Sequence, residues 1–116
     1  MGNELKDLKT RLRQFANERD WDQFHSPKNL AMALIVEAAE LVEQFQWLTQ
    51  DESRSLPPEK QQAVEDEIAD ILIYLVRIAD KLDIDLLEAA GKKLAQNAEK
   101  YPAEKVRGLS RKYNEY

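Results

Sequence analysis

Residues 27–48 limit how this chain can fold more than any other stretch, because a helix formed by them would carry apolar side chains on nearly all of its sides. An α-helix turns about 100° per residue, which places Leu30 and Leu41 on one side of this segment and Ile35 and Val42 on the other. A helix of this kind has to be covered on both sides, either by its own bundle or by another subunit. We therefore expect an all-α fold that assembles as a homo-oligomer.

The spacing of apolar residues predicts three further helices, at about residues 4–18, 58–82 and 86–100. Ser26 followed by Pro27 is typical of a helix start, and Pro102 is expected to stop the last helix. No strand-like alternation or internal repeat is present in the sequence. We predict a bundle of four to five helices in one domain at residues 1–105, followed by a polar tail at residues 106–116.

The composition excludes several classes of protein. The chain of 116 residues has no cysteine, so it cannot form disulfides, zinc–thiolate sites or iron–sulfur clusters. Its formal net charge of −5 disfavours a nucleic-acid polymer as partner. The charged N-terminal sequence lacks the apolar core of a signal peptide, and no apolar run is long enough to span a bilayer. We expect a cytoplasmic protein with no membrane partner.

Two carboxylates interrupt the apolar helix at Glu37 and Glu40. Glu37 shares the side of Leu30 and Leu41, and burying an ionised carboxylate without a partner is costly. No lysine or arginine occurs between Lys28 and Arg54 that could compensate the charge. The compensating charge must therefore come from elsewhere.

The helix at about residues 58–82 repeats this pattern with Glu67 and Asp70, again three residues apart. Residues at this spacing lie on one face of a helix, so two such pairs on facing helices can surround one point with four carboxylates. A divalent cation would remove their repulsion, and oxygen ligands favour Mg²⁺, or Mn²⁺, over Zn²⁺. The alternatives are a structural ion pair or an ordinary solvated face.

The acid motifs and their surroundings resemble the MazG-like nucleotide pyrophosphohydrolases of the all-α NTP pyrophosphatase superfamily. The resemblance extends over RDWDQFHSPKNLAMALIVEAAELVEQFQW, DEIADILIYLV, KKLAQNAEKYP and the terminal SRKYNEY, which together look like the dCTP pyrophosphatase subgroup. These segments span nearly the whole chain from about residue 15.

The resemblance implies an enzyme that hydrolyses a nucleoside triphosphate to the monophosphate and pyrophosphate with Mg²⁺, in the cleaning of the nucleotide pool. It implies a homodimer or homotetramer with the site between subunits. It assigns metal binding to Glu37, Glu40, Glu67 and Asp70. It places other residues around the nucleotide, Lys93 and Asn97 at the triphosphate or sugar, and Trp21, His25, Trp47 and Tyr74 at the base and sugar.

Without the family resemblance, the chemistry of several of these residues allows a second role. Lys93 has the position of an ordinary surface lysine, and His25 either caps a turn or hydrogen-bonds a base edge. The aromatic residues either stack on a base or pack in the core, and core packing is favoured for Phe24. Arg111 and Lys112 either fold over the phosphates or belong to a disordered tail.

The most favoured function is thus a Mg²⁺-dependent nucleoside triphosphate pyrophosphohydrolase acting on dCTP or a modified dCTP. Glu37 and Glu40 are the candidates for the general base, and spacing alone does not separate base from metal ligand. The same chemistry on dUTP or on many nucleotides is one alternative. A non-catalytic helical module that senses nucleotides or binds a partner is another.

Overall fold

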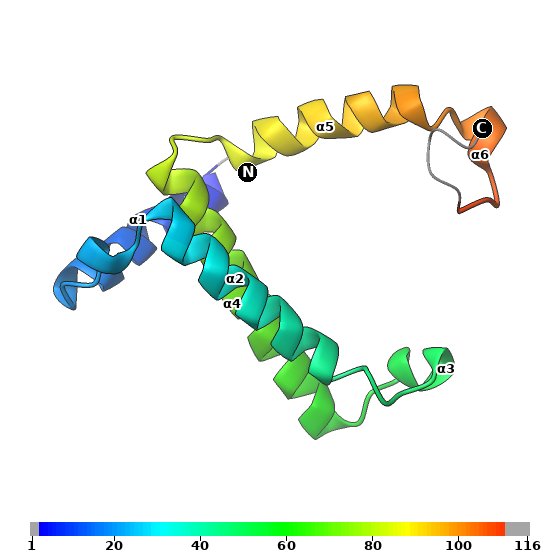
Figure 1. The fold of residues 1–116 in the computed structure, drawn as a ribbon, viewed down its shortest axis with the longest axis horizontal. Helices are drawn as coiled ribbons and strands as arrows, with labels where there is room; N and C mark the ends of the chain where they lie inside the picture. The colour runs from blue at the N-terminus through cyan, green and yellow to red at the C-terminus, as the bar shows by residue number, and fades with distance from the viewer. Residues whose placement is uncertain (1–2, 111–116) are drawn as a thin grey trace. The chain divides into compact units, whose positions relative to one another are not determined.

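The computed structural model describes residues 3–110, and every regular element in that part of the chain is helical. The all-α class predicted from the sequence is confirmed. Figure 1 shows the elements in order: α1 (Asn3–Glu18), the 3₁₀ helix η1 (Asp22–Phe24), α2 (Pro27–Glu43), α3 (Gln50–Ser53), α4 (Pro58–Lys81), α5 (Leu86–Lys100) and α6 (Ala103–Val106).

The four long helices agree with the predicted ones, whereas α3, α6 and η1 were not predicted. Elements of one turn have no apolar period that a sequence pattern could reveal. Within residues 3–110 the structure thus has six α-helices rather than four to five. None of the helices described is long and apolar enough to cross a membrane.

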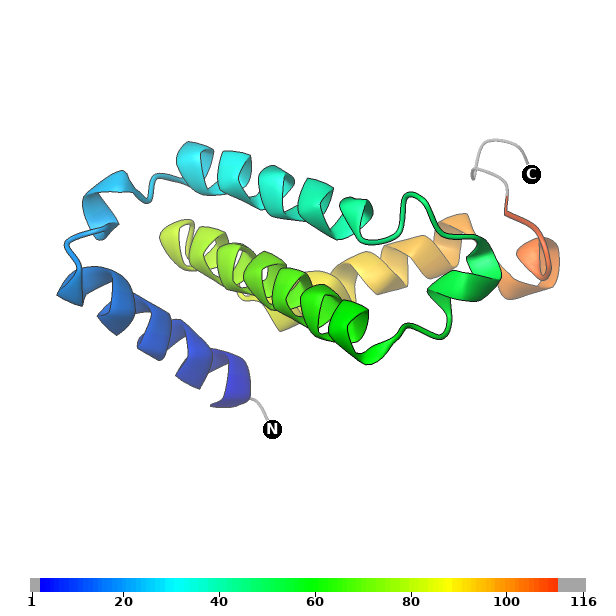
Figure 2. The same ribbon diagram turned by 90° about the horizontal axis from the view of Figure 1, so that it is seen from below.

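The chain divides into two compact units between Asp83 and Ile84. In the first unit, α2 and α4 lie side by side and run in opposite directions, as Figures 1 and 2 show, and α1 also packs against α4. The second unit holds α5 and α6.

Capping side chains fix where the helices begin. The Ser26 hydroxyl accepts a hydrogen bond from the backbone N–H of Asn29 at 3.1 Å, and Pro27 occupies the first turn, so the predicted start of α2 is confirmed. At α5 the carboxylate of Asp85 accepts from the backbone N–H of Glu88 at 3.1 Å.

The expected end of the second helix was wrong, because α2 ends at Glu43 and not near residue 48. Beyond Glu43 the backbone closes tighter turns, in which the N–H of Phe45 donates to the carbonyl of Val42 at 2.9 Å. Thr49 then adopts an extended conformation and forms a capping box with Glu52 at the start of α3. The chain has to leave the helix before it can make this cap.

The core of the first unit lies where α1, α2 and α4 meet. Its buried apolar residues are Ala16, Leu30, Val64, Val76 and Ala79. The apolar stripe of α4 that carries Ile68, Leu72 and Leu75 remains 40% to 53% exposed. The neighbouring stripe, which carries Glu67 and Tyr74, is the more covered one.

Candidate metal centre

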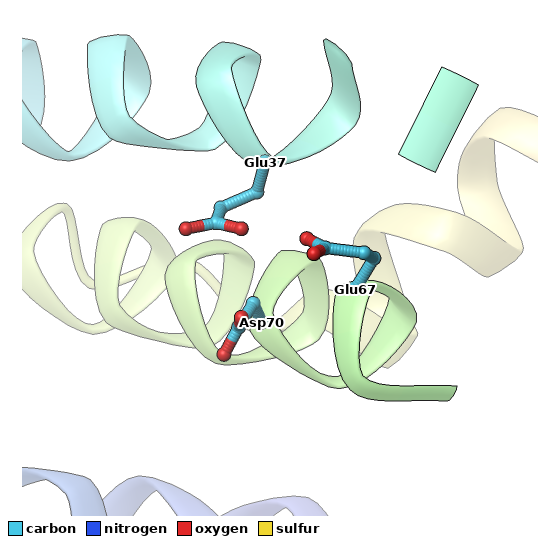
Figure 3. A group of neighbouring side chains, drawn as sticks. All are labelled: Glu37, Glu67 and Asp70. Carbon is cyan, nitrogen blue, oxygen red and sulfur yellow. The ribbon is translucent and has the colours of Figure 1, made fainter. Parts of the chain in front are cut away.

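Three carboxylates from two helices come together in the first unit. Glu37 extends from α2 toward α4, where Glu67 and Asp70 project from successive turns (Figure 3). One oxygen from each of the three residues lies within 4.8 Å of the other two. The antiparallel packing of α2 on α4 therefore gathers acids that the sequence separates by some thirty residues, as the i, i+3 spacing led us to expect.

Two of these carboxylates each have one buried oxygen without a hydrogen-bond partner. In the described part of the chain, three buried side-chain polar atoms lack a hydrogen bond, and two of them are Oε2 of Glu37 and Oε2 of Glu67. Within residues 3–83, no salt bridge joins a lysine or arginine to Glu37, Glu67 or Asp70. An unsatisfied buried acceptor costs about 1–3 kcal/mol, and more if it is charged.

The electrostatics reflect this crowding. Burial, followed by the nearby carboxyl groups of Glu67 and Glu40, raises the pKa of Glu37 to about 7. Burial is also the main cause that raises the pKa of Glu67 above the usual glutamate range, with the Glu40 and Asp70 charges adding to it. The chain by itself thus holds these carboxyls in a site where their charged forms are disfavoured.

A hard divalent cation fits this set of donors. Mg²⁺ and Mn²⁺ prefer carboxylate oxygens, and such an ion would give the orphaned oxygens of Glu37 and Glu67 the positive partner that the protein does not supply. Glu37, Glu67 and Asp70 are the residues that could hold the ion. Glu40 lies outside this group of three, although its charge is close enough to raise the pKa values of Glu37 and Glu67.

Tyr74 is the aromatic residue that lies beside the acids. Burial and then the charges of Glu37 and Asp70 raise the pKa of its phenol. Trp21 instead packs edge-to-face on Phe15 with ring centroids 5.8 Å apart, and Trp47 is 87% exposed in the turn after α2. Phe24, for which core packing was favoured, is 60% exposed in η1.

Four of the predicted site residues come after the first unit in the sequence. Lys93 is exposed and Asn97 half-buried on α5. The carbonyl of Asn97 accepts a hydrogen bond from the N–H of Tyr101 at 2.8 Å at the end of this helix. Arg111 and Lys112 lie outside the described residues.

A second charged group, near the C-terminal end of α4, was missed by the sequence analysis. The buried Arg77 bonds to Asp22 of η1 at 2.9 Å, lies 3.5 Å from Asp80, and has its Nη2 3.2 Å from Nδ1 of His25. Asp80 also pairs with Arg13 of α1, and Asp22 with Lys81. These charged residues, together with Asn17, line a surface hollow. A cation among the apolar residues of YLVRIA was the signal that could have revealed this network.

The fold and the acidic cluster define an all-α protein with a carboxylate-rich candidate metal centre. The chain belongs to the MazG-like family, whose sequence profile matches residues 32–116, so the resemblance inferred from the motifs is confirmed. It is 43% identical over 113 residues to dCTP pyrophosphatase 1 of Homo sapiens and 41% identical over 113 residues to that of Mus musculus. Each alignment covers 96% of this chain and 66% of the relative, so the chain spans about two thirds of the length of these curated relatives.

A solved structure with the same fold is also similar in sequence. The crystal structure of a pyrophosphatase from Archaeoglobus fulgidus matches with a TM-score of 0.79 and 42% identity. The match covers 84% of this chain and 91% of that one. The MazG-like fold predicted for this chain is thereby confirmed.

Proposed function

We propose that this protein hydrolyses a nucleoside triphosphate to the nucleoside monophosphate and pyrophosphate. The observation that carries the proposal is the convergence of Glu37, Glu67 and Asp70, two of which leave a buried oxygen without a partner. The relatives named dCTP pyrophosphatase 1 support the same chemistry and favour dCTP, or a base-modified dCTP, as substrate. The proposal places the protein in the cytoplasm, in nucleotide-pool cleaning.

Divalent-cation dependence follows from the charges. A bound Mg²⁺, with Mn²⁺ as a substitute, would neutralise charge on the phosphate oxygens and polarise the scissile bond. Glu37, Glu67 and Asp70 would hold it, with Glu40 beside them. The net negative charge of the chain makes a metal-borne triphosphate a better ligand than a free one.

The remaining chemistry is the attack of water on phosphorus together with the transfer of one water proton. Water forms a new bond to phosphorus, a P–O bond of the αβ bridge breaks, and pyrophosphate leaves. Glu40 is the proposed acceptor of the water proton, because it stands next to the group of three without belonging to it. Glu37 is the alternative base, since its pKa of about 7 is close to the working pH. Glu40→Gln should abolish turnover but keep metal binding if Glu40 is the base.

The proposed nucleotide contacts are those that the family motifs assign. Lys93 and Asn97 of α5, with Arg111 and Lys112 of the tail, would contact the phosphates and sugar. The base and sugar would contact Trp21, His25, Trp47 and Tyr74. These assignments rest on the family motifs, and separate alanine variants should raise KM more than they lower kcat if they are right.

We also propose a homodimer or homotetramer. The outer face of α2 exposes Met32, Ile35 and Val42 by 58% to 66%, and large exposed apolar faces of this kind mark interfaces. Light scattering at micromolar concentration should give a multiple of the 13.5 kDa chain mass. Ile35→Asp should lower the mass to that of one chain, whereas Lys28→Gln, an exposed polar change on the same helix, should not.

Residues 1–105 are proposed to act as one domain that includes both compact units, with residues 106–116 as its tail. A chain ending at residue 105 should keep one thermal transition and its helical content. Two separate transitions in this shortened chain would contradict the one-domain proposal.

The decisive experiment is pyrophosphate release from a panel of dNTPs and NTPs with Mg²⁺ and with EDTA. Release that is strongest from dCTP and lost in EDTA is the expected result. Release from dUTP or from many nucleotides would keep the chemistry and change the substrate. No release from any nucleotide with Mg²⁺ present would favour the non-catalytic nucleotide-sensing module.

A further inference from the structure

Arg77 is buried in a way that is unusual for its type. The residue is 3% exposed on α4, although arginine is almost never fully buried unless it is paired. Its Nη2 donates to a carboxylate oxygen of Asp22 at 2.9 Å, and its Nη1 lies 3.5 Å from Asp80. Two carboxylates from η1 and α4 therefore hold the guanidinium in one orientation.

The third neighbour of this guanidinium is the imidazole of His25. Nη2 of Arg77 lies 3.2 Å from Nδ1 of His25. Arginine does not lose its proton in proteins and has no acceptor, so it can only donate in this contact. Nδ1 must therefore be the acceptor, which leaves the ring proton of neutral His25 on Nε2.

The charges around His25 favour the same neutral form. Burial and then the positive charge of Arg77 hold the pKa of His25 below its usual range. Lys81 acts in the same direction, and the charge of Asp22 opposes it. A protonated ring would turn an N–H toward the N–H of Arg77, so protonation has to break their hydrogen bond.

The backbone of His25 is held as well. Its N–H donates to the carbonyl of Asp22 at 3.0 Å, and the next residue, Ser26, caps α2. The side-chain amide of Asn29 donates to the carbonyl of Phe24 at 3.0 Å. Within residues 3–110 no hydrogen bond to Nε2 of His25 is found, and Nε2 is not among the buried unpartnered atoms. This nitrogen is thus free to meet a ligand.

We propose that Arg77 is a positioning residue that fixes His25 as a neutral Nε2–H donor for an acceptor atom on the nucleobase. A neutral donor suits a carbonyl oxygen, such as that of a pyrimidine, whereas a phosphate oxygen is better matched by a cation. The inference rests on the proposed nucleotide binding. It adds that Arg77, which contacts His25 and not the ligand, determines which ring nitrogen of His25 faces the ligand.

The protonation state can be read directly by NMR, because His25 is the only histidine of the chain. Long-range ¹H–¹⁵N spectra of the full-length ¹⁵N-labelled protein should show a protonated Nε2 and an unprotonated Nδ1 at pH 7. The titration midpoint should lie below the ordinary histidine value. A proton on Nδ1, or a charged ring at pH 7, would overturn the inference in the unmodified protein, whether or not any variant folds.

Variants then test the role of Arg77. Arg77→Met should let the two tautomers mix and raise the midpoint of His25, because the donor and the cation are both removed. Arg13→Met is the matched control, since Arg13 contacts Asp80 of the same network and no hydrogen bond joins it to His25. It should leave the tautomer and the midpoint unchanged. An unchanged spectrum in a folded Arg77→Met protein would contradict the positioning role.

Steady-state kinetics test the proposed contact between His25 and the nucleobase. With a pyrimidine triphosphate, Arg77→Met should raise KM by about 3- to 10-fold, the loss expected for one hydrogen bond, and leave kcat nearly unchanged. An unchanged KM together with the predicted tautomer would overturn the contact to the base. Absence of hydrolysis in the unmodified protein would instead refute the proposed function, and the NMR result would stand by itself.

Discussion

Helix α4 carries two groups of carboxylates in opposite surroundings. Near its C-terminal end, hydrogen bonds from Arg13 hold the pKa of Asp80 below the usual range, and Lys81 followed by Arg77 does the same for Asp22 of η1. Nearer its middle, burial raises the pKa of Glu67, and burial raises that of Glu37 on α2 to about 7. The same chemical group is stabilised as an anion in one place and destabilised in the other.

The difference is the supply of cations. Arg13, Arg77 and Lys81 reach the first group from α1 and α4, so both of its carboxylates have cationic partners, and the ion pairs tie η1 and α1 to α4. Nε of Arg77 is the buried nitrogen of this network that makes no hydrogen bond within residues 3–110. The acids between α2 and α4 have no such partner within residues 3–83, and two of their oxygens are orphaned. We interpret the network as one whose charges are matched within the chain, with Arg77 also positioning His25, and the acidic cluster as a site that is completed by something from outside the chain.

The largest expected effect is in the acidic cluster. Glu37→Gln should lower the rate of pyrophosphate release by about 100-fold or more, because losing a metal ligand removes several kcal/mol of charge stabilisation and each 1.4 kcal/mol is tenfold. Urea unfolding at pH 8 should show no loss of stability in this variant, since the neutral amide replaces a carboxylate whose charged form is disfavoured in this buried site. Glu43→Gln, an exposed change on the same helix, should keep the rate. A folded Glu37→Gln protein with an unchanged rate would refute the metal-site assignment.

In the network, the same kind of change should act on stability. Asp80→Asn should lower the free energy of unfolding by about 2–3 kcal/mol, because it leaves the buried Arg77 with one carboxylate fewer. Asp51→Asn removes an exposed pair with Arg54 and should cost less than about 1 kcal/mol. Equal losses in the two variants, measured by urea unfolding, would show that burial of the pair makes no difference.

The two groups should also respond differently to pH. Because the pKa of Glu37 is raised to about 7, its proton competes with a cation. The apparent affinity for Mg²⁺ should therefore rise as pH rises from 6 to about 7, by up to tenfold per unit for one proton, and level off above 7.

Over this pH range the network should stay constant. The pKa values of Asp22 and Asp80 are lowered, so their contribution to stability is present above the unfolded-state pKa and is lost only as the pH falls through the lower folded-state values. Calorimetric Mg²⁺ titrations at pH 6, 7 and 8 measure the change, and Glu37→Gln should flatten it. A pH-independent affinity in the unmodified protein would mean that Glu37 does not exchange its proton for the ion.

The smallest effect on stability is expected for the exposed ion pair of the network, Lys81 with Asp22. Lys81 and Asp22 are 26% and 49% exposed at their side chains, and pairs this accessible to water contribute about 1 kcal/mol or less. Lys81→Met should lower the free energy of unfolding by no more than that and raise the pKa of Asp22 toward its ordinary value. A loss as large as that of Asp80→Asn would show that the exposed Lys81–Asp22 pair stabilises the fold as much as the buried part of the network does.

Much of this architecture follows from periodicity. The three- and four-residue spacing of apolar residues predicted the four long helices. The matching i, i+3 pairs predicted four converging carboxylates, of which Glu37, Glu67 and Asp70 form one group and Glu40 lies outside it. The end of α2 was missed because it depends on a local capping box at Thr49.

The faces of α4 show what a helical wheel cannot decide. The stripe with Ile68 and the stripe with Glu67 lie side by side, and only the position of α2 determines which of them is covered. The Arg77 network was missed for a related reason. Asp22 and Arg77 are 55 residues apart in sequence, and no short-range pattern links them.

The most direct test of the account is to map a paramagnetic cation on the protein. Small additions of Mn²⁺ to the ¹⁵N-labelled chain should broaden the backbone amide signals around Glu37, Glu67 and Asp70 first and most strongly. Excess Mg²⁺ should restore these signals, and Glu37→Gln should weaken the effect. Broadening that begins at Asp22 and Asp80, or that spreads evenly over the exposed acids, would contradict the claim that the orphaned carboxylates between α2 and α4 form the metal centre.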